Sequence, residues 1–150
     1  MTEADNPPVR RWADLPEPEA ELARAGFEAW QAGRLDDADE ALHRLRDLAA
    51  SGGGTDAMFH ALHLLACVAF SREDYGTSRA LHEEVLRMCD VMSFAGGSAS
   101  SLFDLAMIDQ AEGNMGAARR RYEQARDLFS SGGYHDRLVV VDRALASCSP

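Results

Sequence analysis

Apolar and small side chains recur along most of the chain at the three- and four-residue steps of a helix, with polar residues between them. From residue 19 onward these runs alternate with short stretches rich in glycine, serine and charge. Such stretches end helices, because glycine readily adopts the left-handed conformation found at a helix C-terminus. The pattern therefore predicts helices and turns. The expected helices cover approximately residues 19–32, 35–50, 56–71, 74–92, 98–112, 115–130 and 136–147.

The expected helices form pairs that repeat every 40 residues. Small residues recur at this interval, at Gly26, Ala66 and Ala106 in the first helix of each pair and at Ala38, Ser78 and Ala118 in the second. A period of about 20 to 50 residues is typical of solenoids, in which each unit buries its apolar side against its neighbours. The stretch from Gly96 to Ser98 is expected to be the turn that precedes the third pair. The last expected helix has no following partner, as expected of a helix that caps a stack.

The turns inside the three pairs resemble those of the tetratricopeptide repeat (TPR) family. They are Gly33 to Ala38, Glu73 to Ser78 and Gly113 to Ala118, and each leads into a second helix that carries a small residue. The resemblance covers roughly residues 19–147 and implies an all-α, right-handed superhelix. It implies a TPR-like domain over residues 19–150, with units at about 19–55, 56–95 and 96–133 and a capping helix at 134–148.

The chain departs from the family in its period and at two buried columns. The typical TPR has about 34 residues, so each unit is longer here, as in the TPR-like regions of bacterial transcriptional regulators. The extra residues are expected in longer second helices and in the turns between units. Nothing in the chain resembles the DNA-binding or nucleotide-hydrolysing domains of those regulators. His82 and Asp109 stand where the family places bulky apolar residues.

Residues 1–18 are interpreted as a flexible N-terminal arm. Four prolines interrupt any helical periodicity, and acidic residues favour hydration of this stretch. Trp12 and Leu15 are the exceptions. An aromatic residue in a polar arm is expected to dock on its own domain rather than to serve as a free recognition motif.

The charge and the cysteine content indicate which partners and which compartment to expect. With a formal net charge of −10 and a single basic run, at 119–121, the chain is not expected to bind nucleic acid or an anionic membrane. Its 15 basic residues include no lysine, which excludes a Schiff-base lysine and a phosphate-loop lysine. The three cysteines lack paired spacing, which favours a reducing compartment. With no signal sequence or long apolar run recognisable, we expect a cytoplasmic protein. The bias toward Ala, Arg and Gly suggests a GC-rich genome, and the resemblance to bacterial TPR-like regions implies a bacterial source.

The resemblance also implies a concave groove lined by the first helices. Its columns fall on Phe27, Trp30, Gln31, His60, His63, Cys67, Phe70, Phe103, Met107 and Gln110. So many apolar groups would form a large exposed patch unless something covered them. One interpretation is a channel for an amphipathic helix or an extended protein segment, with the aromatic residues as anchors. The alternative is that a tight superhelix or the N-terminal arm fills the groove.

Two clusters are candidates for further chemistry. His60, His63 and Cys67 share one helical face and are of the types that bind zinc or copper, but they could equally form hydrogen bonds beside a small thiol. Asp104 and Asp109 could act as an acid or base if buried. Asp109 could equally face solvent, pair with an arginine of a neighbouring helix such as Arg79, or cap the turn.

The combined prediction is a protein- or peptide-binding adaptor or regulatory module, without a cofactor or bound metal, that could also self-associate. No catalytic motif is present, so an enzyme is not expected. The alternatives are a small-molecule or metal-responsive sensor that uses the same groove and, with less support, an enzyme of a specialised pathway built on helical repeats.

Overall fold

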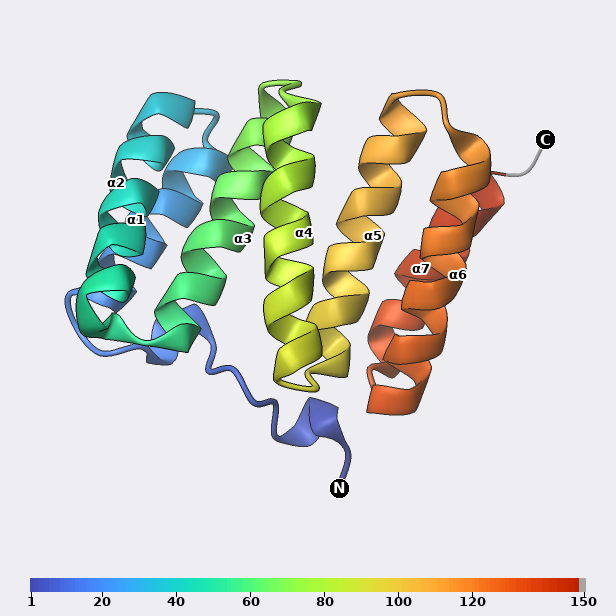
Figure 1. The fold of residues 1–150 in the computed structure, drawn as a ribbon, viewed down its shortest axis with the longest axis horizontal. Coiled ribbons are helices and arrows are strands. Elements are labelled where there is room, and N and C mark those ends of the chain that lie inside the picture. Colours follow the sequence, from blue (N-terminus) through green and yellow to red (C-terminus); the bar gives the residue numbers. More distant parts are fainter. Residues whose placement is uncertain (149–150) are drawn as a thin grey trace. The chain divides into compact units, whose positions relative to one another are not determined.

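The computed structural model describes residues 1–148, and within this range the protein contains seven α-helices and no β-strand. The helices are α1 (Glu19–Gln31), α2 (Leu35–Leu48), α3 (Thr55–Ser71), α4 (Tyr75–Val91), α5 (Ala95–Ala111), α6 (Met115–Gly132) and α7 (His135–Ser147) (Figure 1). The prediction of an all-α protein is confirmed. None of the described helices combines the length and the apolar character needed to cross a bilayer.

The turns between paired helices repeat in their backbone geometry. Gly33, Glu73 and Gly113 lie 40 residues apart and adopt positive φ angles of 75°, 59° and 83°. The N–H group of the residue after each of them donates to a carbonyl five residues earlier. These bonds are Arg34 to Ala29, Asp74 to Ala69 and Asn114 to Asp109, at 2.8, 2.9 and 2.8 Å. This bond pattern satisfies carbonyls that the end of a helix would otherwise leave unpaired.

The second helices of the pairs repeat in their burial. Buried residues follow steps of four, three and four in each: Ala38, Leu42 and Leu45 of α2 with Ala49 directly after its end; Ser78, His82, Val85 and Cys89 of α4; Ala118, Tyr122, Ala125 and Phe129 of α6. The 40-residue repeat is therefore a repeat of structure as well as of sequence. The superhelical arrangement implied by the TPR resemblance stays a prediction, as do the family itself and the predicted unit boundaries.

One predicted turn is wrong. Gly96 and Gly97 lie inside α5, which begins at Ala95, and both are buried. A Cβ atom on Gly96 would lie 2.4 Å from Cζ of Tyr134, and one on Gly97 would lie 2.5 Å from Sγ of Cys89. The glycines therefore allow close packing within a helix instead of forming a turn. The chain turns earlier, at Ser93, whose φ is 55°.

The chain forms two compact units. The N-terminal unit, Val9–Leu81, contains α1, α2, α3 and the first part of α4. In it, α2 packs on α1 and α3 packs on α2 (Figure 1). A Cβ atom on Gly26 would lie 2.5 Å from Cδ2 of Leu42, so glycine permits the close approach of α1 and α2. Leu42 and Leu45 are fully buried in the core of this unit.

The C-terminal unit contains the rest of α4 and α5 to α7, together with the first eight residues of the chain. Helix α6 packs on α5, and α7 packs on α6. Residue Glu3 binds the start of α5: its Oε2 accepts from the N–H of Ala95 at 2.9 Å, and its Oε1 accepts from the N–H of Gly96 at 2.7 Å and from the hydroxyl of Tyr134 at 2.9 Å. Burial and this carboxylate raise the pKa of Tyr134.

Candidate functional site

The predicted groove residues are divided between the two units. Phe27, Trp30 and Gln31 lie on α1 and His60, His63, Cys67 and Phe70 on α3, all in the N-terminal unit, whereas Phe103, Met107 and Gln110 lie on α5 in the C-terminal unit.

In the N-terminal unit, part of this surface is covered by the chain's own residues 9–15, here called the docked segment. It contains a short 3₁₀ turn, Trp12–Asp14, which contacts both α1 and α3. The ring centroid of Trp12 lies 5.6 Å from that of Phe27, and Phe27 lies 5.9 Å from Trp30. Val9 and Leu15, at either end of the segment, are 4% and 6% exposed. The expectation that Trp12 docks on its own domain is therefore confirmed.

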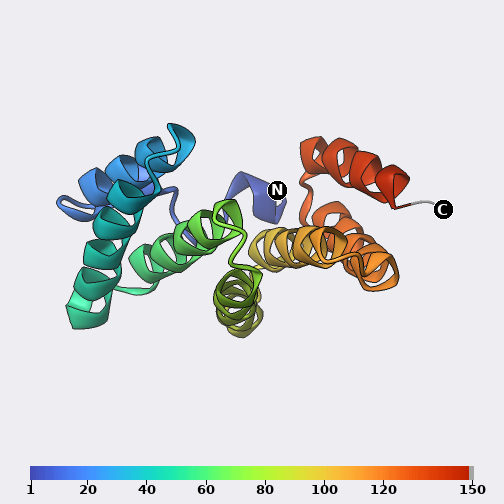
Figure 2. The ribbon, with the colours of Figure 1, turned by 90° about the horizontal axis from the view of Figure 1, so that it is seen from above.

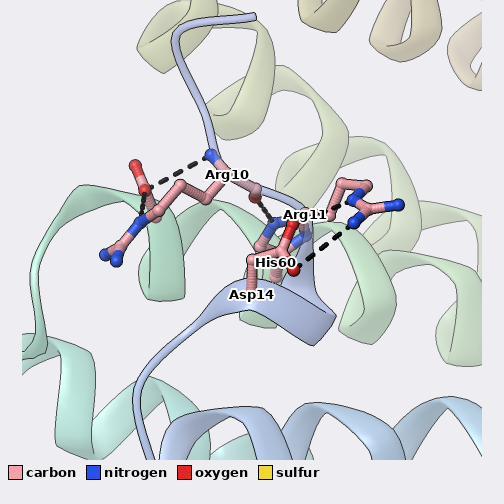
Figure 3. Close-up of polar contacts among 5 residues, drawn as sticks. Arg10, Arg11, Asp14 and His60 are labelled. Atoms are coloured by element: carbon pink, nitrogen blue, oxygen red, sulfur yellow. Dashed lines mark hydrogen bonds and ion pairs between the residues drawn. The ribbon is translucent and has the colours of Figure 1, made fainter.

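Arg10 binds the docked segment to α3 through three polar contacts (Figure 3). Its backbone N–H and its Nε both donate to Oδ2 of Asp56, at 3.3 and 2.7 Å. Its carbonyl oxygen lies 2.6 Å from Nε2 of His60. Because a carbonyl only accepts, the ring nitrogen is the donor, which assigns the Nε2–H tautomer to a neutral His60. Within the segment itself, Arg11 pairs with Asp14 at 2.9 Å.

His60 is therefore a hydrogen-bonding residue of the docked segment's site. Burial lowers its pKa, against the opposing effects of the Arg10 carbonyl and of Asp56. The ring of Phe59 packs against His60 at 5.1 Å and against His63 at 6.1 Å. Across residues 1–148, no three His, Cys, Asp or Glu side chains are grouped so that they could hold a metal ion. Of the two interpretations of His60, this contact realises the hydrogen-bonding one.

The remaining predicted groove residues of the N-terminal unit have varied surroundings. Trp30 is half-buried, and its Nε1 donates to Oγ of Ser71 at 2.9 Å. Phe70 packs against Tyr75 with 5.5 Å between ring centroids. Cys67 is half-buried and is not part of a disulfide, and Gln31 is exposed. Trp30 and Phe70 thus both have partners within the unit, and of these four residues only Gln31 is exposed.

In the C-terminal unit the predicted groove residues are held mainly by contacts inside the unit. The ring of Phe103 packs against that of Tyr122 at 5.1 Å. Gln110 accepts from the Tyr122 hydroxyl at 3.0 Å and donates to Oγ of Ser147 at 3.0 Å. Burial raises the pKa of Tyr122 to about 12. Met107 is 37% exposed and is the member that solvent reaches most readily.

The two acidic candidates form pairs within the C-terminal unit. Asp109 is 3% exposed and forms an ion pair with Arg121 of α6. Of the alternatives that the sequence left open for Asp109, the structure shows pairing with an arginine of a neighbouring helix, and that arginine is Arg121. Asp104 lies 3.7 Å from Nδ1 of His82, which is itself 2% exposed. The two polar residues in apolar columns of the repeat, His82 and Asp109, therefore each lie next to a charged residue of a neighbouring helix.

Sequence reasoning missed Arg10 and Asp56, the polar partners that bind the docked segment. The signal that could have found them was present, because Val9, Trp12 and Leu15 are apolar residues at three-residue steps in an otherwise polar stretch. It also missed Glu3, whose contact with α5 has no local pattern, since its partners lie about 90 residues away along the chain.

Comparison of the chain with protein-family models gave no match, and neither did comparison with curated proteins.

Proposed function

We propose that this protein is a TPR-type adaptor or regulatory module that binds an extended segment of a partner protein on the surface of α1 and α3. The proposal includes the right-handed superhelix and the intracellular setting that the TPR resemblance implies. The observation that carries it is the docked segment, which already lies on this surface through an aromatic anchor and a backbone contact.

The chemistry of the docked segment describes the partner. Arg10 supplies a guanidinium group for Asp56 and a carbonyl for His60, Trp12 supplies the aromatic ring that packs on Phe27, and Leu15 supplies a buried apolar group. Interfaces depend on a few such aromatic and arginine anchors. The expected partner therefore carries an arginine, an aromatic residue two positions later and an aliphatic residue three positions after that.

A partner must compete with the docked segment, which is part of the same chain. A short flexible connection gives such a segment an effective concentration of the order of millimolar. Displacement by a weak partner is therefore suppressed, and only a partner of higher affinity, or one at high local concentration, binds. This competition is the regulatory element of the proposal.

The state of the three cysteines supports the proposed intracellular setting. Cys67, Cys89 and Cys148 are not joined in disulfides, and burial raises the pKa of Cys89 to about 12. A thiol with so high a pKa stays protonated and unreactive near neutral pH. Such cysteines suit a reducing compartment.

The test uses the full chain and a fluorescent peptide with the sequence of residues 7–17. Arg10→Ala/Trp12→Ala weakens the docked segment, so this variant should bind the peptide at least about tenfold more tightly than the unaltered chain, measured by fluorescence anisotropy. Adding Phe27→Ala should remove most of the gain, because the peptide's tryptophan then lacks its contact. Adding Met107→Ala instead is the matched control and should leave binding unchanged.

Two results would contradict the proposal. One is equally weak binding of the peptide to the unaltered chain and to Arg10→Ala/Trp12→Ala, with circular dichroism showing that both are folded. The other is binding of the variant that does not depend on the tryptophan of the peptide, tested with a peptide in which that residue is alanine.

A further inference from the structure

Helix α7 packs on α6 through one side only. Val141 is fully buried there, and Leu138, Ala144 and Leu145 lie in the same apolar cluster. The contact is supplemented by an ion pair at 2.8 Å between Arg126 of α6 and Asp142. The ribbon in Figure 2 shows α7 against α6, with the other elements of the C-terminal unit leaving its far side uncovered.

The opposite side of α7 carries four exposed residues, here called the α7 stripe: Asp136, Val139, Val140 and Arg143. Their steps of three, one and three residues place them on one face of the helix. Val139 is 54% exposed and Val140 is 39% exposed. Two adjacent exposed valines are costly in a helix, since β-branched residues have lower helix propensity and their apolar surface gains nothing in water.

The internal repeat allows this side of α7 to be compared with the equivalent side of α5. Ala99 lies one period before Val139 and is fully buried in the cluster formed with α6. Phe103 lies one period before Arg143 and packs on Tyr122 of α6. In α5 the equivalent side is thus covered by a second helix. Among the described residues, no helix covers it in α7.

The order of residues in the α7 stripe makes it complementary to itself when two copies run in opposite directions. A two-fold axis between Val139 and Val140 places each Val139 opposite the other copy's Val140. The same axis places each Asp136 opposite the other copy's Arg143. Two ion pairs then flank a small apolar centre. In a parallel arrangement the like charges would face each other, which is unfavourable.

We propose that this protein self-associates through antiparallel pairing of α7 with α7 of a second copy. The occupant is a second copy because the stripe has one acidic and one basic end and therefore complements its own sequence in reverse. A strongly basic or acidic partner would leave one end facing a like charge. This inference is independent of the proposed binding of a partner segment to α1 and α3.

The small area of the α7 stripe limits the strength of the association. Helix α7 has 13 residues, which corresponds to a length of about 20 Å. A stable interface commonly buries about 800 Å² on each partner, more than one helical stripe offers. The dimer is therefore weak and should be populated in the range from about ten micromolar to one millimolar.

The test is sedimentation equilibrium of the full chain over this concentration range. The unaltered chain should show a monomer–dimer equilibrium, and Val139→Asp should weaken it at least about tenfold. Val91→Asp is the matched control, because Val91 is 87% exposed and lies outside α7; it should leave the equilibrium unchanged. All substituted positions are exposed, and circular dichroism verifies that each variant is folded.

Charge reversal tests the antiparallel register. Asp136→Arg alone and Arg143→Asp alone should each weaken the dimer at least about tenfold, because both ends of the interface then carry like charges. The combined Asp136→Arg/Arg143→Asp variant should restore it to within about threefold of the unaltered chain. The proposal is overturned if the unaltered chain stays monomeric up to one millimolar, if the dimer survives Val139→Asp, or if the double reversal fails to restore it.

Discussion

Phe27 and Met107 occupy the same position of the 40-residue repeat, two periods apart, and their surroundings differ. In the N-terminal unit, Phe27 is covered by Trp12 of the docked segment. In the C-terminal unit, Met107 is 37% exposed. The next position on this face differs in the same way, because Trp30 in the first pair of helices corresponds to Gln110 in the third.

This comparison shows how aromatic residues on a repeat surface should be interpreted. In the N-terminal unit the docked segment lies on the aromatic residues, so these residues do not form an open apolar groove. In the C-terminal unit, the aromatic residue Phe103 packs on Tyr122 inside a helical hairpin. The two units therefore bury similar rings by different means, and substitutions can separate the two.

The largest effect is expected at Tyr122, which is 1% exposed. Tyr122→Ala should lower the free energy of unfolding by about 4 kcal/mol, because it leaves a cavity beside Phe103. Tyr122→Phe should cost only about 1 kcal/mol, for the lost hydrogen bond to Gln110. Urea unfolding followed by circular dichroism measures both. A cost below about 2 kcal/mol for Tyr122→Ala would show that Phe103 is not held from inside the hairpin.

A smaller loss is expected at Gly26, where the N-terminal unit uses glycine and the third pair uses Ala106. Gly26→Ala should destabilise the protein by about 2 kcal/mol, because its Cβ would lie 2.5 Å from a buried Leu42 methyl group. Gly76→Ala is the control, since a Cβ there meets nothing within 4 Å. Thermal melting should show the control to be as stable as the unaltered chain or slightly more stable. Equal melting temperatures for the two variants would rule out the close approach of α1 and α2.

Removing the Trp12 side chain, which covers Phe27, should lower the free energy of unfolding less than removing the Tyr122 side chain. Trp12→Ala should cost about 1.5 kcal/mol, because Trp12 is only half-buried. Since the chain has two tryptophans, this variant leaves Trp30 as the reporter, and its emission should shift to longer wavelength as water reaches Phe27 and Trp30. Met107→Ala in the C-terminal unit should cost less than about 1 kcal/mol. An unshifted emission in Trp12→Ala would mean that the docked segment does not shield this surface.

The smallest effect is a pH dependence confined to the N-terminal unit. Burial holds the pKa of His60 below the ordinary histidine value of about 6.5, so the unfolded chain takes up this proton more readily than the folded protein. Stability should therefore fall as the pH drops below about 6.5, and the docked segment should loosen. Hydrogen exchange around residues 9–15 at pH 7.5 and 5.5 measures this. His60→Gln should reduce the dependence, and an unchanged dependence in that variant would exclude His60 as its source.

Much of the fold could be predicted from the sequence because the relevant signals are local. Helix periodicity and turn glycines are short-range, and the repeat supplied three copies of each signal. The turns at Gly33 and Gly113 follow directly from residue type. The pair Gly96 and Gly97 was misread because the same residue type serves both turns and close helix packing, and only the positions of Tyr134 and Cys89 distinguish the two uses.

The candidate site was less predictable because its parts come from distant segments. The contacts of Arg10 with Asp56 and His60 join residues 46 and 50 positions apart. Trp12 was recognised as an anchor from its type, but its polar partners depend on how the docked segment lies across α1 and α3. His60, His63 and Cys67 do share one helix, as expected, yet the partner of His60 is a backbone carbonyl, which no side-chain pattern reveals.

The contact of Glu3 with the start of α5 has a consequence for how the molecule is made and handled. The third residue of the chain completes a helix whose first residue is number 95, so during synthesis that helix's carboxylate partner leaves the ribosome long before the helix itself exists. Removing Glu3, or fusing a bulky tag next to it, will therefore weaken the unit that contains α5.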